Sequence, residues 1–202
     1  MRRRLSSILV AGVLTIATAV FGAVPASAAD PWTVTPGGPF RINGGGFSLT
    51  DNSTGTQVGC TTWSLSGQFK SGSGLPGYDI GRLFASSTFS GCAAPLGMTF
   101  AVTMGGTWRI DALGYQSPGG MTSGTITNGG MRFSGPLCSF TLSGGIIPIT
   151  YSNNNAEMRF DVGSSSAISG VSGCFGLISN GDRTTLRFGS GFVVPPQIIT
   201  HP

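Results

Sequence analysis

One run of the sequence alternates without a break: Met98-Thr99-Phe100-Ala101-Val102-Thr103-Met104. Four apolar side chains, from Met98 to Met104, therefore fall on one side of an extended chain, and small residues fall on the other. A period of two residues is typical of a β-strand. One apolar face and one polar face indicate an antiparallel sheet that is buried on one side only.

The same alternation recurs along the chain, at 108–112, 138–142 and 158–162. Further strands are expected at 47–50, 58–69, 82–89, 121–127, 146–151 and 184–188. No stretch of about ten residues carries a helical apolar period without an internal Gly or Pro. The sequence therefore predicts an all-β protein, built as an antiparallel β-sandwich or a partly closed barrel.

Glycine and asparagine mark the expected turns. Gly105-Gly106 lies between two predicted strands, where a hairpin turn would stand, and Asn180-Gly181-Asp182 has the Asn-Gly signature of a tight turn. Gly72-Ser73-Gly74-Leu75-Pro76-Gly77 has the spacing of a dinucleotide-binding loop, but no helix follows it, so we expect a flexible loop. The proline-containing ends, about 29–39 and 193–202, are expected to be loose extended segments.

The first 28 residues have the organisation of a secretory signal peptide. Arg2–Arg4 is a positive start, Ile8–Val24 is apolar, and Ala26-Ser27-Ala28 is a small-residue cleavage site. An uncleaved membrane anchor is the alternative, although the apolar span is short for a bilayer. We expect residues 1–28 to be removed, leaving 29–202 as a single secreted domain with no membrane span, either extracellular or loosely associated with the cell envelope.

Removal of residues 1–28 changes the charge balance. The formal net charge of +4 includes three arginines in this segment, and without them eight cationic residues stand against seven acidic ones, for a net charge of +1. The eight are spread along the chain: Arg41, Lys70, Arg82, Arg109, Arg132, Arg159, Arg183 and Arg187. Nucleic-acid binding needs a clustered basic face, so we expect no nucleic-acid partner.

Four cysteines, Cys60, Cys92, Cys138 and Cys174, predict two disulfides in an exported chain. Their wide spacing and the lack of nearby histidine argue against a metal site. Three pairings are open. A faint internal repeat follows Cys60 (Ser64-Leu65-Ser66-Gly67) and Cys138 (Thr141-Leu142-Ser143-Gly144). It favours two related halves, each with its own bridge: Cys60–Cys92 and Cys138–Cys174.

Catalytic chemistry has little support in the sequence. His201 is the only histidine, so a triad of nucleophile, histidine and acid is not expected, and no cofactor or metal motif is present. A hydrolase with paired carboxylates is an alternative, because such enzymes need only two acids across a cleft. The candidates are Asp79, Asp111, Glu157, Asp161 and Asp182. Alternation with apolar neighbours places Asp111, Glu157 and Asp161 on solvated sheet faces.

Aromatic residues suggest a second alternative, a carbohydrate or small-molecule binding module. Trp32 in the proline-flanked arm, together with Tyr78 and Tyr115 in Gly/Pro-containing loops, could form an exposed platform for sugar rings. Trp108 alternates with Ile110 and is expected in the core. Polar faces rich in Ser and Thr, with Lys70 as the only lysine, would also suit self-association or adhesion to a cell-envelope polymer.

The chain resembles a group of secreted actinobacterial proteins of unknown function. The resemblance is carried by the arginine-led signal ending in Ala26-Ser27-Ala28, the four spaced cysteines, Gly106-Thr107-Trp108, and Cys174-Phe175-Gly176-Leu177-Ile178 leading into Asn180-Gly181-Asp182. It implies export and a disulfide-bonded β fold, and it supplies no catalytic or binding residues. We therefore expect a secreted, non-enzymatic binding or structural protein.

Overall fold

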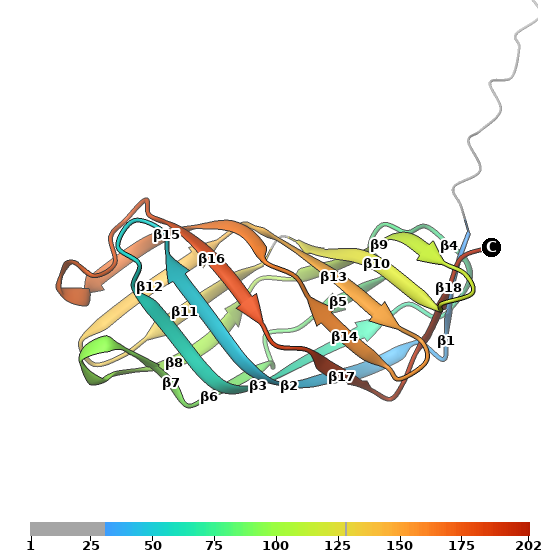
Figure 1. The fold of residues 1–202 in the computed structure, drawn as a ribbon, viewed down its shortest axis with the longest axis horizontal. Coiled ribbons are helices and arrows are strands. Elements are labelled where there is room, and N and C mark those ends of the chain that lie inside the picture. The colour runs from blue at the N-terminus through green and yellow to red at the C-terminus, as the bar shows by residue number, and fades with distance from the viewer. Residues whose placement is uncertain (1–30, 128) are drawn as a thin grey trace, which may run out of the picture.

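The computed structural model describes residues 31–127 and 129–202, without the side chains of residues 164 and 165 (Figure 1). The predicted signal peptide, residues 1–28, lies outside the described residues. Within them the chain is all-β, as predicted: its strands are joined by turns, and the only helical elements are two single-turn 3-10 helices, η1 (Pro95–Gly97) and η2 (Cys174–Gly176).

Most of the predicted runs form strands and the long ones extend beyond them, but the single strand expected at 82–89 is wrong, because two short strands, 81–83 and 88–90, stand there instead. Their bounds are β1 (Trp32–Thr35), β2 (Gly38–Asp51), β3 (Gln57–Phe69), β4 (Gly72–Leu75), β5 (Gly81–Leu83), β6 (Thr88–Ser90), β7 (Cys92–Ala94), β8 (Met98–Gly105), β9 (Trp108–Gln116), β10 (Met121–Thr127), β11 (Gly130–Ser134), β12 (Cys138–Ser143), β13 (Ile146–Ser152), β14 (Glu157–Phe160), β15 (Gly163–Gly173), β16 (Arg183–Phe188), β17 (Gly191–Val194) and β18 (Ile198–Thr200).

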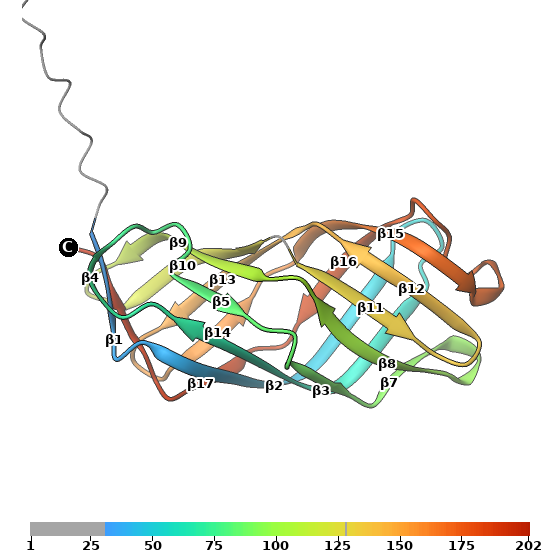
Figure 2. The ribbon, with the colours of Figure 1, turned by 180° about the vertical axis from the view of Figure 1, so that it is seen from behind.

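The main antiparallel sheet closes on itself in two places. One ring runs β5-β9-β10-β13-β14-β17-β2-β3 and returns to β5; the other runs β2-β16-β15-β12-β11-β8-β7-β3 and returns to β2. Strands β2 and β3 belong to both rings, so the two rings lie side by side along the long axis of the molecule (Figures 1 and 2).

The expectation of a hairpin at Gly105-Gly106 is wrong. Strand β8 pairs with β11, whereas β9 pairs with β10, so the two glycines join strands of different rings. The chain bends there and continues in the same general direction from β8 into β9. The strands that pair with them, β11 and β10, also belong to the second and the first ring respectively. Gly106 adopts φ +69°, which a residue without a Cβ reaches without strain.

The interior of the rings is filled by the apolar faces that the alternation predicted. Trp108 is 5% exposed and belongs to this core, as expected. Aromatic rings pack against one another in this core: Phe133 stacks on Phe140 with centroids 4.7 Å apart, and Trp63 meets Phe188 edge-on at 5.6 Å. Offset and edge-on arrangements are the favoured geometries for such rings.

Both disulfides have the predicted pairing, Cys60–Cys92 and Cys138–Cys174. The first joins β3 to β7, and the second joins β12 to the turn that follows β15; each pair of strands is adjacent in the second ring. Around that ring β12 lies four strands from β3, and β15 four strands from β7. The bridges thus occupy corresponding positions on opposite sides, as expected if the chain contains two related halves.

The expectation of loose ends is wrong for the described residues. Strand β1 pairs with β18 on one side and with β4 on the other, forming a three-stranded sheet at one end of the molecule (Figure 1). Val34 and Ile199 are buried against the first ring. Strand β4 contains residues expected to be a flexible loop, Gly72–Leu75. The prolines flank these short strands rather than interrupt them, which leaves their pairing intact.

Candidate functional site

Cavities inside the rings are too small to hold a ligand. The two that lie among the described core residues measure about 10 Å³ each, which is the space of about one water molecule. Neither of these two cavities can hold a ligand, so the depressions on the outer surface are the candidate sites.

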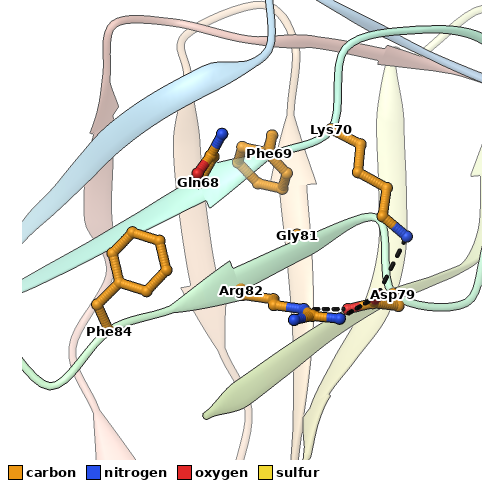
Figure 3. Close-up of a pocket in the computed structure, with 7 residues that line it drawn as sticks. All are labelled: Gln68, Phe69, Lys70, Asp79, Gly81, Arg82 and Phe84. Atoms are coloured by element: carbon orange, nitrogen blue, oxygen red, sulfur yellow. Dashed lines mark hydrogen bonds and ion pairs between the residues drawn. The ribbon is translucent and has the colours of Figure 1, made fainter.

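One surface depression is a pocket of about 280 Å³ across β3 and β5 (Figure 3). Its floor is the pair of strands themselves, since Gln68 pairs with Arg82 and Phe69 pairs with Gly81. Figure 3 shows the Phe84 ring at one end and the charged groups at the other. The lining residues are Gln68, Phe69, Lys70, Asp79, Gly81, Arg82 and Phe84.

Two neighbouring depressions extend this pocket in both directions. One of about 290 Å³ shares Asp79 and Arg82 with it and is also lined by Tyr78, Thr107 and Arg109. The other, of about 410 Å³, shares Phe84 and is also lined by Pro39, Phe40, Arg41, Ser66, Gly67, Ser86 and Val194. We call the three together the β5 groove.

A short turn, residues 76–80, builds the charged end of the groove. The Ala112 N–H donates to the Gly77 carbonyl at 2.8 Å, and the Asp79 N–H donates to Asp111 Oδ1 at 2.7 Å, so the turn lies flat over β9. Asp79 takes a left-handed conformation, φ +56°, that aspartate tolerates better than most residues. This cover buries Asp111 and brings Asp79 over β5.

Asp79 is the centre of an ion-pair cluster. Its carboxylate accepts hydrogen bonds from Arg82 Nε at 2.9 Å and Nη2 at 2.8 Å, and from Lys70 Nζ at 3.1 Å. The Arg82 hydrogen bonds, joined by those of Lys70, outweigh desolvation and lower the pKa of Asp79 from 3.8 to about 2. The group is therefore an anion at neutral pH and holds both cations in place.

A second ion pair lies beside the first. Arg109 Nε contacts the two Asp111 oxygens at 2.8 and 2.9 Å, and Arg109 Nη1 donates to the Tyr78 hydroxyl at 2.8 Å. The Arg109 guanidinium also lies 4.1 Å from the centroid of the Tyr78 ring, a cation–π distance. These contacts fix an exposed tyrosine at the mouth of the groove.

The cations of the groove retain unused donors. Arg82 is 56% and Lys70 44% exposed at the side chain, and their contacts to Asp79 leave Arg82 Nη1 and two ammonium hydrogens without a partner among the described residues. Arg41, farther along the groove, is exposed. The cations that are scattered in the sequence are thus partly gathered by the fold: four of the eight line one groove, beside the exposed rings of Tyr78 and Phe84.

The three aromatic residues predicted as a sugar platform do not form one. Trp32 is only 4% exposed, which corrects the expectation of an exposed arm residue: β1 is paired on both sides and the Trp32 ring meets His201 at 4.9 Å. Tyr115 is half-buried against the core. Tyr78 alone is strongly exposed, at 63%, and lies in the groove.

Of the three carboxylates expected on solvated faces, Asp161 is exposed as expected, Glu157 is half-buried and Asp111 is buried. Asp111 is 7% exposed rather than solvated, because the 76–80 turn covers it. Glu157 is paired with Arg159 at 3.1 Å. Asp79 lines the groove and Asp111 lies next to it beneath the turn, but each carboxylate is held by arginine. General acid catalysis needs a carboxyl that keeps its proton, and a pKa of about 2 does not allow this for Asp79.

Sequence reasoning missed five of the groove residues as binding groups: Arg41, Lys70, Arg82, Phe84 and Arg109. The spacing Asp79-x-x-Arg82 was an available signal, because an aspartate three residues before an arginine at a turn can pair with it. Lys70 and Arg109 join the cluster only through the pairing of β5 with β3 and with β9, which no local pattern encodes.

The chain matches no protein-family model, no similar curated protein and no similar solved structure. Among the described residues no helix is long and apolar enough to cross a membrane. In the same part of the chain no three histidine, cysteine or acidic residues gather in a way that could hold a metal ion. The two disulfides are typical of proteins from oxidising compartments.

Proposed function

We propose that this chain is an exported, non-enzymatic binding protein of the extracellular space or cell envelope, and that the β5 groove binds an anionic glycan. Export is supported by the signal-like residues 1–28, by the two disulfides and by the resemblance to secreted actinobacterial proteins. An oxidising compartment outside the cytoplasm is where such bridges persist.

One observation supports an anionic glycan as the ligand: cations with unused hydrogen-bond donors alternate with exposed aromatic faces along one groove. Arg82 and Lys70 offer charged hydrogen bonds to a carboxylate or sulfate group, while Phe84 and Tyr78 offer apolar faces to sugar rings. The three contiguous depressions suit an extended polymer better than a small compact ligand. Asp79 in the groove is bound by arginine and lysine, and the adjacent Asp111 by arginine, which favours binding over hydrolysis.

Pull-down with insoluble or immobilised polysaccharides tests the proposal directly. The protein should bind polygalacturonate and should not bind neutral dextran, and added salt should weaken the binding by screening the charges. Arg82→Ala should reduce binding about tenfold, which corresponds to about 1.4 kcal/mol. Arg132→Ala, on β11 in the other ring, removes the same charge outside the groove and should bind like the parent protein.

Two results would contradict the proposal. Equal binding to acidic and neutral polymers would show that the groove cations do not contribute to ligand binding. Preferential binding of duplex DNA over polygalacturonate at the same salt concentration would assign the groove to a different class of polyanion.

A further inference from the structure

Two loops meet at the end of the molecule that lies away from the three-stranded sheet (Figure 1). One is the β2–β3 hairpin turn, residues 52–56, and the other is the 177–182 loop before β16. Thr54 Oγ1 donates to the Leu177 carbonyl at 2.8 Å, and Ser53 Oγ donates to Asp182 Oδ1 at 2.9 Å. The two loops are thus held together by oxygen-bearing groups.

Asp51 lies beneath this junction and is completely buried. Its Oδ1 accepts the N–H groups of Ser53 at 2.8 Å and Thr54 at 3.3 Å. Its Oδ2 is equally buried and has no hydrogen-bond donor among the residues that the structure describes. Ser53 connects Asp51 to Asp182, because its N–H donates to Asp51 Oδ1 and its Oγ donates to Asp182 Oδ1. Asp182 Oδ2 accepts the Ser179 N–H at 2.9 Å. Burial, together with the nearby Asp182 carboxyl, raises the pKa of Asp51.

Two interacting carboxyls, one of them completely buried, need a proton or a cation beside them. Among the described residues, the ion pairs formed by lysine and arginine involve Asp79, Asp111 and Glu157, and none reaches Asp51 or Asp182. A buried carboxylate without a compensating charge is costly. The complete burial of Asp51 also excludes a substrate, so only a proton or a small ion can occupy the position.

We propose that a calcium ion binds between the carboxylates of Asp51 and Asp182. Calcium takes oxygen ligands in flexible numbers and geometry, and the junction supplies oxygens from two chain segments. Asp182 is half-exposed, so an ion and its remaining water ligands can enter from that side. Ser53 Oγ, already next to Asp182 Oδ1, is a further oxygen at the same place. Histidine and cysteine, the ligands that favour zinc, are not part of this junction.

The site would tie the β2–β3 hairpin to the 177–182 loop and is separate from the β5 groove. A site with only two carboxylate ligands binds calcium weakly, because affinity rises with the number of charged ligands. Calcium sites of this kind in extracellular proteins have dissociation constants of about 0.1 to 1 mM. Such affinity suits a protein in a medium with millimolar calcium. The ion would then stabilise the end of the second ring without taking part in ligand binding.

Calcium titration of the chelator-treated, oxidised protein tests this proposal. Calorimetry should detect one site per chain, and calcium should raise the thermal unfolding midpoint. Asp182→Asn removes one carboxylate but keeps the shape, so it should weaken binding by about tenfold or more and remove the calcium-dependent shift. Asp161→Asn, an exposed carboxylate on another segment, serves as the matched control and should keep both.

The proposal fails if the parent protein shows neither binding nor a shift in its midpoint. It also fails if Asp182→Asn retains the parent affinity, since calcium would then bind elsewhere. A calcium-independent midpoint that rises on acidification would show that a shared proton occupies the position instead. Because Asp182→Asn leaves the β5 groove untouched, polygalacturonate binding by this variant reports on the groove separately.

Discussion

The Tyr151 hydroxyl makes two hydrogen bonds to the backbone of Gln197. It donates to the Gln197 carbonyl at 2.7 Å and accepts the Gln197 N–H at 3.0 Å. Both residues are buried, and burial raises the pKa of Tyr151. The Gln197 side chain then accepts the Gly37 N–H at 2.8 Å. One tyrosine of β13 thus connects both chain ends of the described residues to the first ring.

Tyr151→Phe should lower the free energy of unfolding by about 1 to 3 kcal/mol, because it leaves both Gln197 backbone groups buried and unsatisfied. Tyr115→Phe is the matched control: its hydroxyl has no hydrogen bond among the described residues, and its loss should cost less than about 0.5 kcal/mol. Urea unfolding monitored by tryptophan fluorescence measures both. Equal costs for the two variants would show that Tyr151 does not hold the ends in place.

The docking of these ends shows where sequence reasoning stops. Period-two alternation located most of the strands, because the pattern is local and each buried face needs only its own residues. Trp32 was expected to be exposed because prolines surround it. Its burial depends on the pairing of Thr33 with Thr200 and on β4, contacts made by residues far away in the sequence. No local pattern encodes such a pairing.

The candidate site also depends on contacts between residues that are far apart in the sequence. Asp111 alternates with apolar neighbours, which predicts a solvated face, yet it is buried because the 76–80 turn covers that face of β9. The cations of the β5 groove come from four strands or their flanking turns, and only the closed sheet brings them together. The disulfide pairing was predictable, because the internal repeat relates the two cysteine pairs without any knowledge of the topology.

Asp79 should stabilise the fold only at pH values where its carboxylate is charged. Its pKa in the folded protein, about 2, is below the ordinary value of 3.8. The stabilisation is therefore fully present above about pH 4 and is lost as the pH falls through the folded value. Asp79→Asn should lower the free energy of unfolding by about 1 kcal/mol at pH 6, since solvent screens the exposed partners; the difference should be small by pH 2 and vanish below it. Denaturant titrations of both proteins across this range measure it; a difference that stays constant would contradict the ion-pair explanation.

Each disulfide should contribute a similar amount to stability. They join residues 32 and 36 apart in sequence, and the entropy that a crosslink removes from the unfolded chain changes little between loops of these lengths. Replacing Cys138 and Cys174 together with alanine should cost about 3 to 4 kcal/mol, and replacing Cys60 and Cys92 should cost nearly the same. Non-reducing denaturant unfolding compares the two double variants. A large difference between them would mean that packing around one bridge, rather than chain entropy, determines its contribution.

Charge and ring stacking should contribute to groove binding in separable ways. Arg41→Ala removes an exposed cation at one end, so it should weaken binding to polygalacturonate and make the remaining affinity less sensitive to salt. Phe84→Ala removes a ring that is 41% exposed between two of the depressions. It should weaken binding about three- to tenfold and leave the salt sensitivity unchanged, because the ring carries no charge.

Affinity measurements at several salt concentrations separate the two effects. Phe175→Ala is the control for the ring, since Phe175 is 67% exposed but lies in η2, outside the β5 groove, and its loss should not alter binding. If Phe84→Ala and Arg41→Ala change the salt sensitivity equally, the ring acts only by shaping the groove and not by stacking. If neither variant binds more weakly than Phe175→Ala, the glycan does not occupy this groove, because its two ends would then contribute nothing to the contact.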